Sequence, residues 1–291
     1  MHYSKQAQNK NIISIATQGI SMANFQKLLV KIKTNRKMRV SKIIEHYPTM
    51  HRAPQTWFMK TLLLAGAFSS LLLADFSSFS NTKKELIKIY DELGESYQKD
   101  FYCQAPFSIN KKGKHAKLEI ITSEFYSPRT PFTKKGKPNQ RAQFIEWEHI
   151  VPAENFGKHL LCWQKGGRKA CQKDKNFRKM EADPYNLVPA IGEINGDRSN
   201  YKYAQASAGL EYNQYGNCKV YTDFKNKRFY PADYSKGYIA RTYLYFEATY
   251  KDFKLSKQEK QLMEAWNKMY PQTKQEHAIR EKITQEVKKY E

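Results

Sequence analysis

Residues 144–157 read Phe-Ile-Glu-Trp-Glu-His-Ile-Val-Pro-Ala-Glu-Asn-Phe-Gly, a stretch that places a carboxylate and an imidazole side by side. Its aromatic and β-branched residues favour an extended strand, which Pro152 is expected to end. Consecutive strand residues point to opposite faces, but a distorted strand end would let Glu148 and His149 face one cleft. A cation-binding carboxylate beside a proton-accepting imidazole is the pairing that metal-assisted hydrolysis requires. Because an isolated Glu-His pair is more often structural, further residues must support this interpretation.

Three other blocks supply that support. Residues 177–200 read Phe-Arg-Lys-Met-Glu-Ala-Asp-Pro-Tyr-Asn-Leu-Val-Pro-Ala-Ile-Gly-Glu-Ile-Asn-Gly-Asp-Arg-Ser-Asn, residues 162–171 enclose Gly-Gly-Arg between two cysteines, and residues 236–243 read Lys-Gly-Tyr-Ile-Ala-Arg-Thr-Tyr. Together with residues 146–157, these blocks resemble the bacterial endonuclease I family of periplasmic and secreted non-specific nucleases. They follow the family's order and cover most of residues 82–270. The resemblance implies an α+β fold with a ββα-metal (His-Me finger) core surrounded by helices, over residues 81–291.

The residue pattern agrees with such a core. Residues 185–191 are predicted to form a second strand, and a helix is predicted to begin near residues 192–195. A helix packed across the strand pair would bring its first turn, with Asn195, close to Glu148 and His149. The resemblance implies that Glu148 and Asn195 bind one Mg²⁺ ion, with waters and the scissile phosphate at its other positions. It also implies that His149 is the general base.

Three further residues are assigned on the same grounds. Arg168 presents a guanidinium group that matches phosphate oxygens and is expected to hold the product-side phosphate or the transition state. Glu181 and Asn186 are candidates for orienting His149 or for holding a metal-bound water. Tyr185 is a departure, because related sequences often have His at this position.

The net charge points to polyanionic partners. The chain has 291 residues with 50 Lys and Arg against 28 Asp and Glu, a formal net charge of +22. An excess of positive charge of this size indicates that the binding partner is nucleic acid or an anionic membrane. Residues 1–80 contain eleven Lys and Arg and two Asp and Glu, so the remaining chain keeps a formal charge of +13. The preference for polyanions therefore does not depend on the N-terminal segment.

Residues 59–80 resemble a secretory signal peptide. They combine a basic start at Lys60, an apolar run over residues 62–74 and small residues after it, and the run is short for a membrane span. Cleavage after either Ala74 or Ser80 fits this pattern. We interpret residues 1–58 as an over-extended N-terminal region with no assigned function and Met59 as the true start. The alternative is a cytoplasmic extension with an uncleaved anchor at residues 62–74.

The four cysteines all follow this segment, and an even number in an exported chain predicts disulfides. Four cysteines allow three pairings. The short spacing favours Cys162 with Cys171, which leaves Cys103 with Cys218. A zinc site is the alternative, but the spacing lacks a close Cys-x-x-Cys or a His pair.

The remaining segments are assigned from periodicity and composition. Residues 127–139 and 162–171 are predicted as loops, and residues 201–234 mix aromatic and basic residues, which suits either nucleic-acid contact or surface hairpins. A strand is predicted over residues 116–125. Helices are predicted over residues 82–98, 237–250 and 256–269, with a charged helix or frayed tail over 272–291.

These observations predict a periplasmic or secreted endonuclease, a monomer with no stable membrane span in its mature form. The resemblance implies double-stranded DNA as the main substrate and RNA as a further one. It also implies little sequence preference, as expected for binding through backbone phosphates, and 5′-phosphate products. The alternative is a secreted basic DNA-binding protein without catalysis. The absence of His-Glu-x-x-His argues against a zinc peptidase.

Overall fold

An antiparallel strand pair and the helix that follows it form the centre of the molecule. The computed structural model describes residues 75–113 and 115–290. Strand β3 (Ile145–His149) pairs with β4 (Leu187–Ile191), and α9 (Gly192–Arg198) follows β4 directly. The predicted succession of two strands and a helix is confirmed, although both strands are shorter than expected and the connection between them is helical rather than a loop. The interpretations of residues 1–58 and 59–74 lie outside the described residues.

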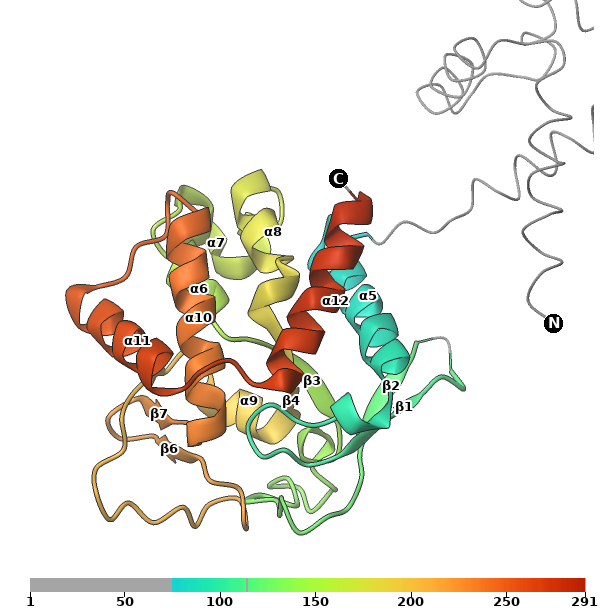
Figure 1. Cartoon of the computed structure of the whole chain (residues 1–291). Coiled ribbons are helices and arrows are strands. Elements are labelled where there is room, and N and C mark those ends of the chain that lie inside the picture. Colours follow the sequence, from blue (N-terminus) through green and yellow to red (C-terminus); the bar gives the residue numbers. More distant parts are fainter. Residues whose placement is uncertain (1–74, 114, 291) are drawn as a thin grey trace, which may run out of the picture. The chain divides into compact units, whose positions relative to one another are not determined.

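Long helices and two small sheets surround this centre, so the α+β class is confirmed. Helix α5 (Phe79–Leu93) lies beside α12 (Lys274–Tyr290), and α10 (Asp233–Thr249) packs against α11 (Lys257–Met269), as Figure 1 shows. The other elements are α6 (Ala153–Gly157), α7 (Leu161–Cys171), α8 (Lys175–Glu181), the hairpin β1 (Phe107–Asn110) and β2 (Lys117–Ile120), and the sheet β5 (Lys202–Tyr203), β6 (Tyr221–Asp223) and β7 (Arg228–Tyr230). Short 3₁₀ turns are η2 (Glu95–Tyr97), η3 (Gln140–Ala142) and η4 (Pro184–Asn186).

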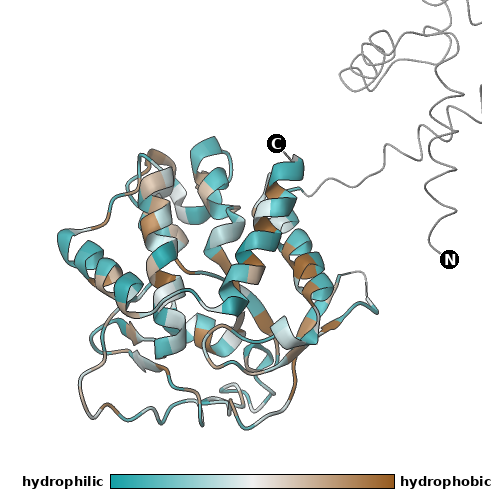
Figure 2. Cartoon of the chain, viewed as in Figure 1, coloured by the Kyte–Doolittle hydropathy of each residue, from teal (hydrophilic) through white to brown (hydrophobic). Residues whose placement is uncertain are grey.

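The core forms where apolar faces meet β3 and β4. Every residue of β4 is buried, and Leu86, Ile89 and Tyr90 bury one face of α5 at helical spacing. Figure 2 shows hydrophobic residues along β3 and α5, whereas the visible faces of α11 and α12 are mostly hydrophilic. The segment after residue 272, predicted as a charged helix or a frayed tail, is a helix. Ile279 and Ile283 are buried on its apolar side.

Helix α5 begins inside the segment interpreted as the end of the signal peptide. Ser78 is its N-cap, and its hydroxyl accepts a hydrogen bond from the Asn81 amide at 3.3 Å. Residues 75–80 thus have a defined place in the fold.

The segment between Cys162 and Cys171 differs from the expected loop, because it is helical. Gly166 and Gly167 interrupt α7, and Gly167 has φ 60° and ψ −155°, a backbone conformation that side chains with a Cβ strongly disfavour. A disulfide joins Cys162 to Cys171 across this kink, and a second joins Cys103 to Cys218. Both predicted disulfides are therefore confirmed.

No helix within residues 75–113 and 115–290 is long and apolar enough to cross a membrane.

Candidate active site

A cavity of about 540 Å³ opens at the end of β3. We call it the site cavity. Its walls come from β3, from the first turn of α5, from α7 and from the last turn of α9. The lining side chains that carry charge or hydrogen-bonding groups are Lys83, Arg141, Glu146, Glu148, His149, Arg168, Asn195, Arg198 and Ser199. The predicted base, arginine and metal ligands therefore lie around one cavity.

The end of β3 explains how two consecutive residues reach the same cavity. His149 is the last strand residue, and the chain then turns, with the Ile150 amide donating to the Asn186 carbonyl at 3.0 Å. Pro152 directly precedes α6, so the strand ends at His149, before the predicted stop at Pro152. Glu148 and His149 are 4% and 7% exposed, so both work in a largely desolvated environment.

One hydrogen bond determines which nitrogen of His149 is basic. Nε2 lies 2.8 Å from the backbone carbonyl of Glu181, which only accepts hydrogen bonds, so Nε2 carries the proton. Nδ1 is therefore the nitrogen with a free lone pair. Burial lowers the pKa of His149 to about 3, opposed by the Glu181 hydrogen bond, so the imidazole is neutral at neutral pH. The Phe79 ring packs against the imidazole, with 4.8 Å between ring centroids.

The Glu148 carboxylate is held through one oxygen. Oε1 accepts hydrogen bonds from the Tyr102 hydroxyl at 3.0 Å and from Arg198 at 2.8 Å. Oε2 accepts none from the residues that the structure describes. Burial raises the pKa of Glu148, whereas the Arg198 charge opposes that rise. The cavity thus contains a positioned carboxylate with one oxygen available to a ligand.

Asn195 is oriented by Glu146. Its amide nitrogen donates to Glu146 Oε2 at 2.9 Å, and Glu146 forms a two-point ion pair with Arg141. Because a carboxylate only accepts hydrogen bonds, the amide NH₂ group must face Glu146, which leaves Oδ1 without a partner among residues 75–113 and 115–290. Gly196 makes room for this arrangement, since a Cβ there would collide with the Arg141 guanidinium.

Glu148 Oε2 and Asn195 Oδ1 are suitable ligands for a hard cation. Both residues line the site cavity, and both oxygens lack hydrogen bonds from the described part of the chain. No cluster of three His, Cys, Asp or Glu side chains that could hold a metal occurs among these residues. A carboxylate and an amide oxygen suit Mg²⁺, which retains several waters, better than Zn²⁺, which prefers nitrogen and sulfur ligands.

Arg168 approaches the same cavity from α7. Its Nε donates to Glu181 Oε1 at 2.6 Å, and Gln172 also binds the Glu181 carboxylate. The guanidinium lies over the Phe79 ring, 5.3 Å from its centroid, and the side chain remains 45% exposed. Nη1 and Nη2 of Arg168 make no hydrogen bond to other described residues, so they are free to bind an anion.

Comparison with known proteins identifies the family to which this arrangement belongs. The model of the Endonuclease I family matches residues 78–289. The chain belongs to the endonuclease I family. It is 40% identical over 212 residues to a periplasmic deoxyribonuclease of Aeromonas hydrophila, covering 72% of this chain and 81% of that protein. It is 42% identical over 221 residues to endonuclease-1 of Buchnera aphidicola subsp. Baizongia pistaciae, covering 73% and 82%.

A third relative is an extracellular deoxyribonuclease of Aeromonas hydrophila, 39% identical over 213 residues, which are 72% of this chain and 85% of that protein. The matched region includes β3, the kinked α7, β4 and α9. The residues that the family model matches thus include the elements that build the site cavity.

Of the two remaining candidate residues, Glu181 borders the site cavity and Asn186 lies outside it. Glu181 borders the site through its backbone, which accepts from His149, and through its carboxylate, which anchors Arg168. Asn186 is fully buried outside the site cavity and bonds both the amide and the carbonyl of Val151, at 2.7 and 3.0 Å. Tyr185 points toward α12, where its hydroxyl pairs with Thr284 at 2.8 Å.

Arg198 and Tyr102 were not predicted as site residues. Arg198 is fully buried and binds Glu148 together with the carbonyls of His149 and Ile150, at 2.8–2.9 Å. Its Cζ lies 4.4 Å from the Tyr203 ring centroid. Its spacing of three residues from Asn195 places both side chains on one side of α9, a signal that was available in the sequence. Tyr102 reaches Glu148 from a distant loop and gave no such signal.

Proposed function

We propose that the chain is an exported, metal-dependent endonuclease that hydrolyses phosphodiester bonds of DNA with little sequence preference. The hydrogen bond from His149 Nε2 to the Glu181 carbonyl carries this proposal, because it leaves Nδ1 as a base in a cavity that also contains two unpaired oxygen ligands. The names of the relatives, periplasmic and extracellular deoxyribonuclease, support the substrate and the compartment.

In the proposed reaction, His149 Nδ1 accepts a proton from a water molecule in the site cavity. The water oxygen then forms a bond to phosphorus while the bond from phosphorus to the 3′-oxygen breaks. The 3′-oxygen takes a proton from solvent, which leaves a 5′-phosphate and a 3′-hydroxyl group. The imidazolium returns its proton to solvent after product release. The Phe79 contact holds the ring in place, and the backbone hydrogen bond fixes its tautomer, so little reorganisation accompanies proton transfer.

Glu148 and Asn195 would hold the Mg²⁺ ion. When bound, the ion supplies positive charge that stabilises the transition state and the departing 3′-oxygen. Arg168 would bind a phosphate oxygen with its free nitrogens, while Glu181 and Gln172 keep its side chain directed toward the cavity. Arg198 would hold Glu148 through Oε1 and so keep Oε2 available.

Binding through phosphates would account for indifference to sequence, since phosphate contacts carry no base information. RNA is a further proposed substrate, because the groups assigned here contact no part of the nucleotide that distinguishes ribose from deoxyribose. We further propose that the chain acts as a monomer in the periplasm or outside the cell. The positive charge of the chain supports nucleic acid as its partner.

Two variants test the function and separate base from ligand. His149→Ala is expected to cleave plasmid DNA at least about a hundredfold more slowly while it still binds Mg²⁺, because only the base is lost. Glu148→Gln is expected to lose activity together with Mg²⁺ affinity. Plasmid cleavage with and without EDTA, beside metal titration by calorimetry, gives both readouts. Full activity of His149→Ala would show that His149 is not the base. If the unmodified chain binds DNA in the presence of EDTA but never cleaves it, the protein is a non-catalytic binding protein.

A further inference from the structure

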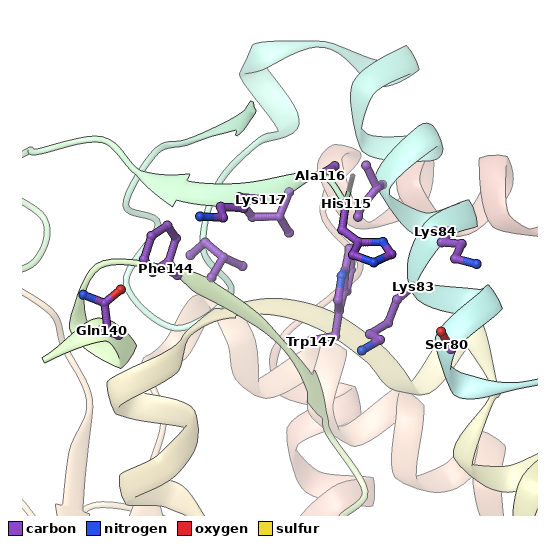
Figure 3. A pocket seen from close by; sticks show the side chains of 12 residues that line it. Ser80, Lys83, Lys84, His115, Ala116, Lys117, Gln140, Phe144 and Trp147 are labelled. Carbon is purple, nitrogen blue, oxygen red and sulfur yellow. The ribbon is translucent and has the colours of Figure 1, made fainter. Parts of the chain in front are cut away.

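A larger cavity, of about 760 Å³, lies next to the site cavity, between α5 and strands β2 and β3 (Figure 3). We call it the lysine cavity. Lys83, Ile145 and Trp147 line both cavities, so the two adjoin at these residues. A ligand that leaves the catalytic residues along this strand would enter the lysine cavity next.

The charged groups of the lysine cavity are all basic. Lys83 and Lys84 come from α5 and Lys117 from β2, and no Asp or Glu is among the residues that line the cavity. None of the three lysines forms a salt bridge with a carboxylate among residues 75–113 and 115–290, in contrast to Lys88 and Lys111. Ammonium groups gathered in a cavity whose lining contains no carboxylate create a positive potential there, which a polyanion neutralises.

Aromatic rings alternate with these lysines. The Lys117 ammonium lies 5.6 Å from the Phe144 ring centroid, and the Lys83 ammonium lies 4.6 Å from that of Phe79. Phe144 and Trp147 line the cavity together with these lysines (Figure 3). Both rings are only partly buried. Cationic groups that track a backbone, interleaved with rings that contact bases or sugars, are the pattern by which proteins bind nucleic acid strands without sequence preference.

We propose that the lysine cavity is a second nucleic-acid subsite, which holds the DNA strand flanking the bond that is cleaved in the site cavity. Lys83 contacts the phosphate that passes from one cavity to the other, and Lys84 and Lys117 contact phosphates further along the same strand. The proposal rests on the proposed nuclease function and extends it by assigning substrate-binding residues on α5 and β2, outside the ββα core.

The double variant Lys84→Ala/Lys117→Ala tests the subsite without altering a residue of the site cavity. Binding of a fluorescein-labelled 20-base-pair DNA duplex is measured by anisotropy in a His149→Ala background, over a series of salt concentrations. Affinity near 0.1 M salt should fall by at least about tenfold, and the slope of log K against log salt should become shallower by about 1–2. The matched control is Lys251→Ala/Lys268→Ala, which removes two exposed lysines that line neither cavity and form no salt bridge; its affinity should stay within about twofold.

Cleavage by the catalytically intact chain provides a second readout. The loss of kcat/KM in Lys84→Ala/Lys117→Ala should be largest for plasmid DNA and should shrink for substrates too short to reach the lysine cavity, such as a dinucleotide. Losses equal to those of the control pair, or losses that do not depend on substrate length, would overturn the subsite. Absence of cleavage by the unmodified chain would instead reject the proposed function, and the binding comparison would still decide whether these lysines contact DNA.

Discussion

Arg198 compensates the negative charge of the buried Glu148 carboxylate. Its guanidinium bonds the Glu148 carboxylate and two backbone carbonyls at the end of β3, so it holds Glu148 in position and favours its ionised form. A buried ion pair contributes little net stability over an apolar pair of the same shape, but removal of one partner leaves an uncompensated charge. The consequence should be measurable as stability, independently of catalysis.

Replacement of Arg198 should therefore destabilise the whole fold. Arg198→Met is expected to lower the free energy of unfolding by about 3–5 kcal/mol, because Glu148 would remain buried with only Tyr102 as a partner. Lys111→Met is the control, since its ion pair with Asp91 is exposed and should contribute at most about 1 kcal/mol. Urea denaturation with intact disulfides provides the comparison, and a similar small loss in both variants would argue against the assigned role.

The Glu146 carboxylate determines that Asn195 Oδ1, and not its NH₂ group, is the atom available to the proposed Mg²⁺ ion. An isolated Asp binds hard cations better than Asn, yet a carboxylate at this position would face the Glu146 carboxylate. Asn195→Asp is therefore expected to weaken the apparent Mg²⁺ affinity by at least about tenfold, within the range found for altered neighbours of metal ligands. Combination with Glu146→Gln restores an amide–carboxylate pair and should recover most of that loss. The Mg²⁺ dependence of plasmid cleavage in the single and double variants measures this coupling, and independent losses would contradict the orientation argument.

At the scale of elements, α5 makes the predicted cleavage position matter to the site. Phe79 is the first residue of this helix, and its ring packs on His149 and beneath Arg168. Cleavage after Ser80 would remove this ring together with the Ser78 cap, whereas cleavage after Ala74 would retain both. The contact therefore favours Ala74 between the two cleavage positions that fit the sequence.

Two chains that begin at Asp75 and at Asn81 test this preference. The shorter chain should cleave DNA at least about tenfold more slowly, because the imidazole loses a packing partner and small displacements of catalytic groups are costly. Within the longer chain, Phe79→Ala should reproduce the loss, and Phe132→Ala, whose ring is 59% exposed, should not. Mass spectrometry of the exported protein gives the natural terminus, and a mature chain that starts at Asn81 with full activity would disprove the role of Phe79.

At the scale of the whole molecule, Asp100 connects distant parts of the chain. Its carboxyl group makes the stability of the fold dependent on pH. Its carboxylate accepts hydrogen bonds from the Cys103 amide and, at 2.8 Å, from the Ile191 amide at the end of β4. Burial raises the pKa of Asp100 to about 7, although the backbone hydrogen bonds oppose the rise. The folded state therefore binds this proton more tightly than the unfolded state, in which the Asp pKa is about 3.9.

Between about pH 4 and pH 7 the folded chain holds more protons at this position than the unfolded chain, so its stability falls as the pH rises. Relative to Asp100→Asn, which does not titrate, the free energy of unfolding should fall by up to about 1.4 kcal/mol per pH unit across this window. Urea denaturation of both chains at several pH values measures the difference. If the stability of the unmodified chain relative to Asp100→Asn stays constant, or rises toward pH 7, the carboxylate is charged throughout.

Much of the centre of the molecule was evident from local patterns. The extended run before Pro152, the apolar residues of β4 and the turn into α9 predicted the ββα order, because strand and helix formation here depends on neighbouring residues and on proline. Cysteine spacing predicted both disulfides, because a short loop favours one pairing and leaves the other. The kink of α7 was missed, because the two glycines suggested a loop while the flanking residues still form helical turns.

The sequence by itself therefore determined the α+β core, the disulfides and the pairing of Glu148 with His149, all features encoded by residues near one another or by covalent chemistry. Tertiary structure alone decided the state of those groups: that Tyr102 and Arg198 hold one oxygen of Glu148, that the Glu181 carbonyl selects the basic nitrogen of His149, and that Phe79 covers the ring. These contacts join residues that are separated by 32–70 positions in the chain. Hydrogen-bond direction, desolvation and ring packing depend on distances of a few ångströms between such segments, which exist only once the helices and strands have packed together.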